Sequence, residues 1–460
     1  MTDLTTLTAS ELASLIRERK VSSAEVVQAH LARIEAVNEQ VNAVTVVLSE
    51  SALEAAKKAD SGAADGPLHG VPFTIKENID CVGTATTNGV PALAESMPTR
   101  DAPVVERMKA AGAIPIGRTN LPEMGLRLST DNPLRGRTLN PYDPDLTAGG
   151  SSGGDAAALA TGMTPFGLGN DIGGSLRNPA YCCGITSLKP TTGRIPRAGS
   201  IEPLDAGMAV QAMLVEGPMT RSVADLEVGL RVLAGRDIRD PRSVDAPLLG
   251  PAPASRRAAI VTEVPGGDVP QATVAAVRKA GDALRDAGWE VVNAEPPELE
   301  AVQQNWAEVI ATDFSVLLPM IQPIIRAPLH ASLQELCARF DTSNKPSSML
   351  HAERSRLGRL WSAFFAEFPV VVGPTWTRLP WPRDADVEPG GLDVVLDAIR
   401  FITPGNVLGL PSVAMPTGLA DGLPTGVQVY ADLWREDLCL EAAGAIENAV
   451  GAPLPVSPAG

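Results

Sequence analysis

The chain has 460 residues, 44% hydrophobic and 20% charged, which is ordinary for a globular protein with a sizeable core. Its net charge of -16 disfavours a general nucleic-acid or anionic-membrane partner. The five cysteines are odd in number and not spaced as a disulfide framework. The sequence shows no signal-peptide pattern and no apolar run near the roughly 20 residues of a membrane span. We therefore expect a cytoplasmic protein.

Two helix starts are visible near the N-terminus. Thr8 is followed by Glu11, and Ser22 by Glu25, each fitting the capping-box pattern. Apolar residues then recur at helical spacing after each pair. These residues predict two helices.

Residues 70–78 have the period of a half-buried strand, because apolar residues alternate with Pro, Thr and Lys. Lys76 would lie at the end of this strand, on the face opposite its apolar side chains. Taken alone, a lysine at a strand end is best explained as a solvated surface charge. A functional role would require another group in the chain that uses an amine.

Residues 103–111 predict a helix and residues 113–117 an apolar strand. Residues 120–148 are rich in Asn, Pro, Asp and Gly and predict a long loop. The small residues of 155–160 predict a buried helix, and residues 166–168 a short strand.

Helical and strand patterns alternate through the second half of the chain. The expected helices are 222–233, 274–287, 350–367 and 436–449, and the expected strands are 258–261, 289–292, 369–372 and 427–430. Such alternation predicts an α/β fold in which helices cover a largely buried sheet.

Two glycine-rich segments, residues 149–155 and 169–179, each place a serine after two glycines. The serines are Ser151 and Ser175. Glycine at this density indicates unusual backbone dihedrals or close approach to a ligand. Backbone N–H groups freed by such turns can hold an anion or a developing oxyanion.

Four roles fit these segments to different degrees. A phosphate-binding loop is weakly supported, because the Gly-Lys-Ser/Thr ending of a P-loop is missing. Residues 149–153 match the Gly-x-Ser-x-Gly of a hydrolase elbow, with Ser151 as nucleophile and only His330 or His351 downstream as base. Serine–lysine chemistry would use Lys76 in place of a histidine. A purely structural role also remains open.

Metal chemistry has little support, since there are only four histidines, no His-Glu-x-x-His and no Cys-x-x-Cys. The adjacent Cys182 and Cys183 fit small buried hydrophobes. We expect neither a metal nor a cofactor.

Several long motifs resemble those of the amidase signature family. The glycine–serine segments 149–154 and 171–180 match its defining region, and residues 70–78 match its lysine strand. Further matches are residues 188–191, 217–226, 403–411 and 422–428. The resemblance runs from about residue 8 to about residue 450 and is weakest between 240 and 390.

The resemblance implies one amidase domain over residues 1–460. Its core would be a large, mixed, twisted β-sheet with helices on both faces. An N-terminal helical region would cover about 1–65, and a variable substrate-pocket region about 240–390.

The resemblance also implies a catalytic triad. Ser175 would be the nucleophile, Ser151 the bridging serine and Lys76 the base. Neutral Lys76 would take a proton through Ser151 from Ser175, which requires burial to lower the lysine pKa from about 10.4. The family's bridging serine has a cis peptide bond.

In the same resemblance, backbone N–H groups form the oxyanion hole, and neighbouring residues support the two loops. The oxyanion donors would be Ile172, Gly173, Gly174 and Ser175. The supporting residues would be Gly150, Ser152, Asp171 and Arg177.

Some positions depart from the family's common pattern without removing a catalytic atom. Asn170 and Ile172 stand where serine or threonine is usual, and Leu146 and Ala148 replace a common arginine and proline. Aromatic residues gather between 300 and 385, and a subset could line an apolar pocket; they are Trp306, Phe314, Trp361, Phe364, Phe365, Trp376 and Trp381.

These implications favour a cofactor-independent serine hydrolase that cleaves amide C–N bonds, with carbamates (urethanes) as a further substrate class. The expected partner is a small-molecule amide or carbamate, and a homodimer stays open. An alternative is the amidotransferase subunit that amidates misacylated tRNA, against which the acidic composition and the divergent residues 201–215 both weigh. An elbow hydrolase using Ser151 and a catalytically silent binding protein on the same fold also stay open.

Overall fold

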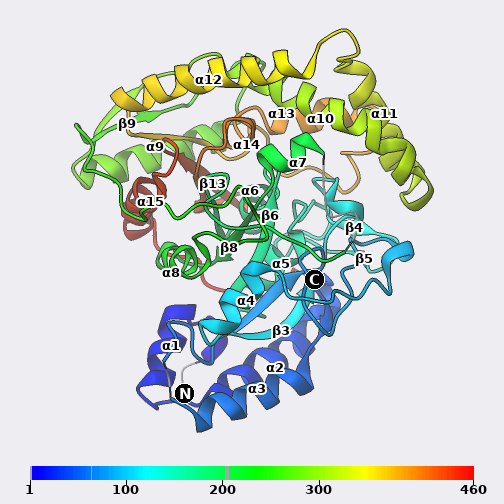
Figure 1. Cartoon of the computed structure of the whole chain (residues 1–460). Coiled ribbons are helices and arrows are strands. Elements are labelled where there is room, and N and C mark those ends of the chain that lie inside the picture. The colour runs from blue at the N-terminus through cyan, green and yellow to red at the C-terminus, as the bar shows by residue number, and fades with distance from the viewer. Residues whose placement is uncertain (1–2, 64, 202–206, 460) are drawn as a thin grey trace.

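A computed structural model describes residues 3–63, 65–201 and 207–459. Its centre is one 11-stranded mixed sheet (Figure 1). In order across the sheet, the strands are β1 (Val44–Val47), β3 (Ile114–Thr119), β2 (Pro72–Lys76), β6 (Phe166–Asp171), β8 (Val215–Thr220), β7 (Thr186–Lys189), β12 (Ser412–Ala420), β13 (Leu423–Tyr430), β11 (Val370–Pro374), β9 (Arg257–Ile260) and β10 (Glu290–Asn293). A separate ribbon pairs β4 (Asp131–Asn132) with β5 (Gly136–Arg137).

Side chains alternate between the two faces of this sheet, and each face is covered by helices. Val370 and Val372 contribute to one core cluster, whereas Val371 between them contributes to another on the opposite face. The helices that pack on the first face are α1 (Ala9–Arg17), α4 (Pro103–Ala110), α8 (Val223–Leu233), α9 (Gln271–Asp286) and α15 (Glu436–Val450).

Two groups of helices cover the second face. One group packs over the N-terminal half of the sheet and comprises α2 (Ser23–Val41), α3 (Ser49–Ser61), α5 (Gly153–Ala160) and α6 (Arg177–Cys183). The other packs over the C-terminal half, at the top of Figure 1, and comprises α7 (Met208–Met213), α10 (Leu299–Ile321), α11 (Ala327–Arg339), α12 (Ser347–Glu367), α13 (Gly391–Ala398) and α14 (Thr403–Val407). The predicted mixed α/β fold with helices on both faces is confirmed.

The predictions that rest on residues close together in the sequence are confirmed. Both capping boxes form, with Thr8 and Ser22 accepting from the backbone of Glu11 and Glu25. The strand expected at residues 166–168 continues to Asp171, because β8 pairs along its whole length and Asp171 lies opposite Val215.

Helix α10 is not among the helices expected from the sequence, although its buried residues Leu299, Val302, Trp306, Ile310 and Phe314 recur at helical spacing. Residues 299–324, with a mean hydropathy of 1.3 in their most apolar window, would suit a membrane span by length and composition alone. In the structure α10 contributes Trp306, Ile310 and Phe314 to the core cluster under α12 and α14.

The sheet order decides where the predicted site residues meet. Strands β2 and β6 are parallel neighbours, so their carboxyl ends lie at the same edge. Lys76 is the last residue of β2, and Asp171 is the last residue of β6. The loop that carries Ser175 therefore begins beside Lys76, as is common for sites in parallel sheets.

Candidate active site

Lys76 is fully buried, although it lies at a strand end where a solvated charge was the simpler expectation. Its Nζ donates a hydrogen bond to Ser151 Oγ at 2.6 Å and another to Asn170 Oδ1 at 2.7 Å. Phe73 and Ile75 of the same strand face the opposite core cluster, as the alternation predicted. The surface-charge interpretation of Lys76 is wrong, and two fixed partners hold its amine.

Burial lowers the pKa of Lys76 from 10.5 to about 7. The nearby carboxyl groups of Asp155, Asp171 and Glu216 act in the opposite direction and raise it. Desolvation outweighs them, so a neutral amine is available near neutral pH. A lysine in this state can accept a proton.

Ser151 lies in a turn that only glycine neighbours allow. The Gly150–Ser151 peptide bond is cis, and Gly149 has a φ of 77°. A Cβ on Gly149 would lie 2.5 Å from the Pro179 Cα, and one on Gly150 would lie 2.7 Å from the Arg127 carbonyl oxygen. The backbone therefore packs too closely at both positions for any side chain.

The second serine loop is held directly against the first. The Ser152 N–H donates to the Ser175 carbonyl oxygen at 3.1 Å. Ser175 is 4% exposed, and in the described part of the chain no hydrogen bond joins its Oγ to that of Ser151. The structure thus brings Lys76 and Ser151 into contact and places the Ser175 loop beside them.

The backbone of the Ser175 loop distinguishes the four predicted oxyanion donors by whether their N–H groups already have an acceptor. Gly174, with a φ of 95°, donates its N–H to Asp171 Oδ1 at 2.7 Å, so this group is already used in holding the loop. The N–H groups of Ile172, Gly173 and Ser175 donate to no acceptor among the described residues. These three remain free to face a substrate oxygen.

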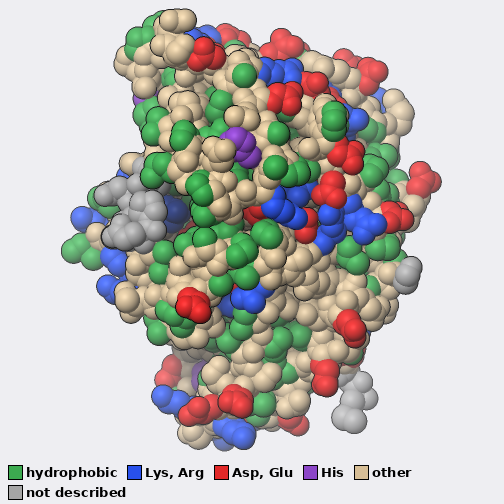
Figure 2. All heavy atoms as spheres, turned by 90° about the vertical axis from the view of Figure 1, so that its right-hand side faces the viewer, with side chains coloured by type: hydrophobic (Ala, Val, Ile, Leu, Met, Phe, Trp, Pro, Cys, Tyr) green, Lys and Arg blue, Asp and Glu red, His purple; other side chains and the backbone are tan. Residues whose placement is uncertain are grey.

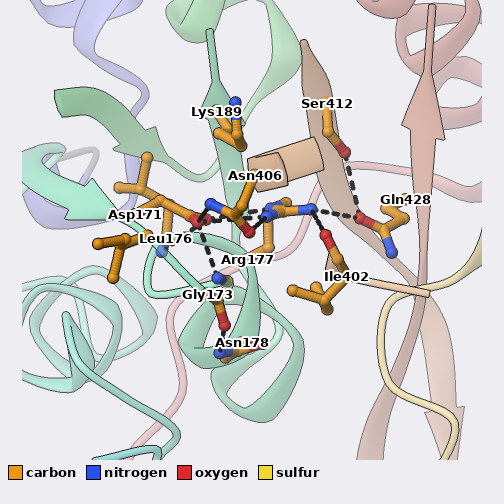
Figure 3. Close-up of polar contacts among 12 residues, drawn as sticks. Asp171, Gly173, Leu176, Arg177, Asn178, Lys189, Ile402, Asn406, Ser412 and Gln428 are labelled. Carbon is orange, nitrogen blue, oxygen red and sulfur yellow. Dashed lines mark hydrogen bonds and ion pairs between the residues drawn. The ribbon is translucent and has the colours of Figure 1, made fainter. Parts of the chain in front are cut away.

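Asp171 and Arg177 form a fully buried ion pair behind this loop (Figure 3). Arg177 Nε donates to Asp171 Oδ2 at 3.0 Å, and its Nη2 donates to Asn406 Oδ1 at 2.7 Å. Asn406 Nδ2 donates a hydrogen bond to Asp171 Oδ1 at 2.7 Å. Burial raises the pKa of Asp171, but the Arg177 charge and hydrogen bonds outweigh it and bring the pKa to about 2.

We expect Asp171→Asn to lower the free energy of unfolding by about 3–5 kcal/mol, because it leaves the Arg177 charge buried and unpaired. Denaturant unfolding at pH 7 measures the loss. Since the pKa of Asp171 is depressed, its contribution is present above about pH 4 and is lost as the pH falls towards about 2.

The matched control is Asp145→Asn, because Asp145 pairs with Arg383 but its side chain is 84% exposed. An exposed pair contributes at most about 1 kcal/mol. Equal losses in the two variants would contradict the structural role of the Asp171–Arg177 pair.

Two asparagines complete the site, and sequence reasoning gave neither a role. Asn170 accepts from Lys76 and donates from Nδ2 to Asn78 Oδ1 at 2.9 Å. Asn178 donates from Nδ2 to the carbonyl oxygens of Gly150 and Gly173 at 3.3 and 3.0 Å, and so ties the two serine loops together. The sequence marked Asn170 only as an asparagine at a position where the family usually has serine or threonine.

The elbow arrangement with Ser151 as nucleophile finds no support in this geometry. His330 and His351 lie on α11 and α12, and neither bonds Ser151 in the described residues. The Ser151 hydroxyl is engaged by Lys76 instead. Among the same residues, no group of three or more His, Cys, Asp or Glu side chains could hold a metal ion.

The predicted aromatic residues divide between core and site. Trp361 is a fully buried core residue. Trp376 is also fully buried, but it donates its indole Nε1–H to Asn178 Oδ1 at 2.7 Å. Trp306, from α10, belongs to the same core cluster and donates its indole Nε1–H to the Ile172 carbonyl oxygen at 3.1 Å. Partly buried apolar side chains pack against the same core cluster; they include Met124, Leu126, Leu128, Ile172 and Ile324.

Comparison with known proteins places this geometry in a family. The family model described as Amidase matches residues 25–440. The chain belongs to the amidase family. The predicted family membership is thus confirmed, and with it hydrolysis of amide carbon–nitrogen bonds.

Individual amidase-family relatives cover nearly the whole chain. An indoleacetamide hydrolase of Bradyrhizobium diazoefficiens is 43% identical over 96% of this chain and 86% of its own length. An acylamidase of Rhodococcus erythropolis is 32% identical over 96% of this chain and 95% of its own. The solved 6-aminohexanoate cyclic dimer hydrolase in complex with substrate has a TM-score of 0.82 and 29% identity, covering 98% of each chain.

Proposed function

We propose that this amidase hydrolyses a small arylacetamide through an acyl-enzyme on Ser175, with Lys76 as base and Ser151 as proton relay. The observation that carries the proposal is the buried Lys76 amine, bonded to Ser151 Oγ at 2.6 Å in the turn that packs against the Ser175 loop. A buried lysine without an ion pair is costly unless its neutral form is used.

The first half of the reaction forms the acyl-enzyme. Neutral Lys76 accepts the Ser151 hydroxyl proton while Ser151 accepts the proton of Ser175. Ser175 Oγ attacks the amide carbon, and the carbonyl electrons move to the oxygen. The relay then runs backwards and protonates the leaving nitrogen, so that the C–N bond breaks and ammonia departs. Water next attacks the ester carbon while the same relay takes its proton. The bond from that carbon to Ser175 Oγ then breaks, the relay returns the proton to Ser175, and the carboxylic acid leaves.

The developing oxyanion needs donors that are fixed before the reaction begins. The unbonded N–H groups of Ile172, Gly173 and Ser175 supply three. Asp171 supports them by holding the Gly174 and Leu176 N–H groups. Arg177 keeps the Asp171 carboxylate ionised.

The arylacetamide assignment rests on two observations. The 43% identical relative carries the name indoleacetamide hydrolase. The Ser175 loop also contacts the indole of Trp306 and itself contains the partly buried Ile172, and both side chains suit an apolar aryl group. Carbamates remain in the proposal as a slower class, because the same nucleophile and oxyanion donors would act on a less electrophilic carbonyl.

We expect kcat/KM to rise with pH through about 7 and then level off. Lys76 has a lowered pKa of about 7, so its neutral, proton-accepting form predominates only above that pH. Initial rates on an arylacetamide between pH 5 and 9 measure the profile. Activity that falls between pH 6 and 8 would contradict a lysine base.

A substrate panel tests the proposed function. Purified protein should hydrolyse indoleacetamide or phenylacetamide at least about tenfold more efficiently than propionamide, because burying the aryl group adds roughly 1–3 kcal/mol of binding. An N-aryl carbamate should be slower, and glutamine should not react. Ammonia release measures the primary amides and glutamine, and arylamine release measures the carbamate. A preference for propionamide would overturn the aryl assignment.

The tRNA-dependent amidotransferase role is the alternative that the panel distinguishes. It predicts glutamine turnover only when partner proteins are added. The net charge of -16 disfavours a tRNA-associated surface. On the face shown in Figure 2, basic side chains lie beside acidic ones instead of forming a purely basic area. A catalytically silent binding protein is disfavoured because Lys76 and Ser151 form a buried hydrogen bond.

A further inference from the structure

Trp306 lies on α10, outside every motif shared with the family, yet it contacts the loop that carries the nucleophile. Its Nε1–H donates to the Ile172 carbonyl oxygen at 3.1 Å. Its ring lies against the next residue, because a Cβ on Gly173 would lie only 2.9 Å from the Trp306 Cζ2. One side chain thus makes a polar and a packing contact with the same peptide unit.

That peptide unit carries one of the three unbonded N–H groups that we propose as oxyanion donors. The Ile172 carbonyl and the Gly173 N–H belong to the same planar, trans peptide and point in opposite directions. Fixing the carbonyl towards Trp306 therefore aims the Gly173 N–H away from the indole. At the next peptide, Asn178 Nδ2 holds the Gly173 carbonyl at 3.0 Å.

The helix that presents Trp306 is itself anchored on both sides. Asn305 donates from Nδ2 to the Leu350 carbonyl on α12 at 3.1 Å, and Gln303 donates to the Leu396 carbonyl on α13 at 2.6 Å. Asp313 accepts the Ala209 N–H of α7 at 2.6 Å. The indole is 8% exposed, so its position is set by packing and not by solvent.

We infer that Trp306 is a positioning residue for the oxyanion hole: its contacts hold the Ile172–Gly173 peptide so that the Gly173 N–H faces the substrate oxygen. The inference rests on the proposed function, because it assigns the Gly173 N–H to the substrate oxygen. It implies that the divergent region of the chain affects the rate of the chemical step as well as the choice of substrate. Removing the indole N–H should then reduce kcat more than it raises KM.

The test is Trp306→Phe, which keeps an aromatic ring and removes the donor. We expect kcat to fall about tenfold, less than the 10²–10³ typical of deleting an oxyanion donor outright, with KM within about twofold. Affinity for an aryl trifluoromethyl ketone, which forms a tetrahedral adduct, should fall in parallel with kcat/KM. Affinity for the arylacetate product should stay unchanged.

Trp361→Phe is the matched control, because Trp361 donates the same kind of bond, to the Pro297 carbonyl at 2.9 Å, within the same core cluster. It should lose stability and keep kcat. Each rate is divided by the concentration of active sites, which is measured by fluorophosphonate labelling of Ser175. The kcat of a partly folded variant then refers to its folded molecules alone. Equal kcat values for the two phenylalanine variants would overturn the inference.

The packing contact between Trp306 and Gly173 can also be tested by a substitution at Gly173. Gly173→Ala should lower kcat strongly in the wild-type chain and less in a Trp306→Leu background, because the added Cβ then has room. Equal costs in both backgrounds would overturn the packing part of the inference. If the wild-type protein shows no amide hydrolysis or no label on Ser175, the proposed function fails instead, which separates the two outcomes.

Discussion

Ser175→Ala should abolish amide hydrolysis, with a loss of at least about 10⁴-fold in kcat, while the protein stays folded. The alanine removes only the attacking oxygen; the bond that joins the two loops runs from the Ser152 N–H to the residue 175 carbonyl and is retained. Ammonia release from an arylacetamide measures the rate, and thermal unfolding measures the fold.

The control for this variant is Ser343→Ala, because Ser343 is an exposed serine that bonds only its neighbour Asp341. It should keep full activity. Labelling with a fluorophosphonate and mapping the adduct adds a direct readout: the label should sit on Ser175 and disappear in the alanine variant. Full activity of Ser175→Ala, or an adduct on Ser151, would show that the nucleophile is misassigned.

Lys76→Met should reduce kcat/KM at pH 7 by about 10²–10⁴-fold, the usual contribution of a general base. Methionine keeps an unbranched apolar stem in the buried site and removes the amine that contacts Ser151 and Asn170. Because hydroxide can then replace the missing base, activity should keep rising above pH 8, where the wild-type protein has levelled off. A pH–rate profile of both proteins measures this difference.

Lys189→Met is the matched control, since Lys189 is also fully buried and burial also lowers its pKa to about 7. Its Nζ donates to the carbonyl oxygens of Pro190 and Leu410 and touches neither serine. The control should lose stability but retain the rise in activity near pH 7. If Lys76→Met kept that rise, the titrating base would have to be another group.

The parts of the fold that depend on neighbouring residues were predictable. The two capping boxes involve residues three apart, and the alternating pattern of β2 placed Lys76 opposite Phe73 and Ile75. Helix α10 was not among the predicted helices, although its buried apolar residues Leu299, Val302, Trp306, Ile310, Phe314, Leu318 and Ile321 recur three or four apart. Its Trp306 was visible in the sequence only as one aromatic among several.

The site was predictable as a set of residues and not as an arrangement. The glycine–serine segments and the lysine strand are long motifs, so the family resemblance named Lys76, Ser151 and Ser175 together. The resemblance also named Gly174 as an oxyanion donor, whereas the structure shows its N–H bonded to Asp171 at 2.7 Å. Which donors are free depends on where a carboxylate 3 residues away points, and spacing alone does not specify that.

The sequence by itself determined the α/β class, the family and the three proposed catalytic side chains, because each is recorded in local periodicity or in an extended motif. Only the tertiary structure decided that the Lys76 amine is buried and bonded to Ser151, since 75 residues separate them and the sheet order brings them together. It also decided that α10 reaches the Ile172–Gly173 peptide through Trp306. Desolvation and contact at such separations depend on how the whole chain packs, and no short stretch of sequence carries that information.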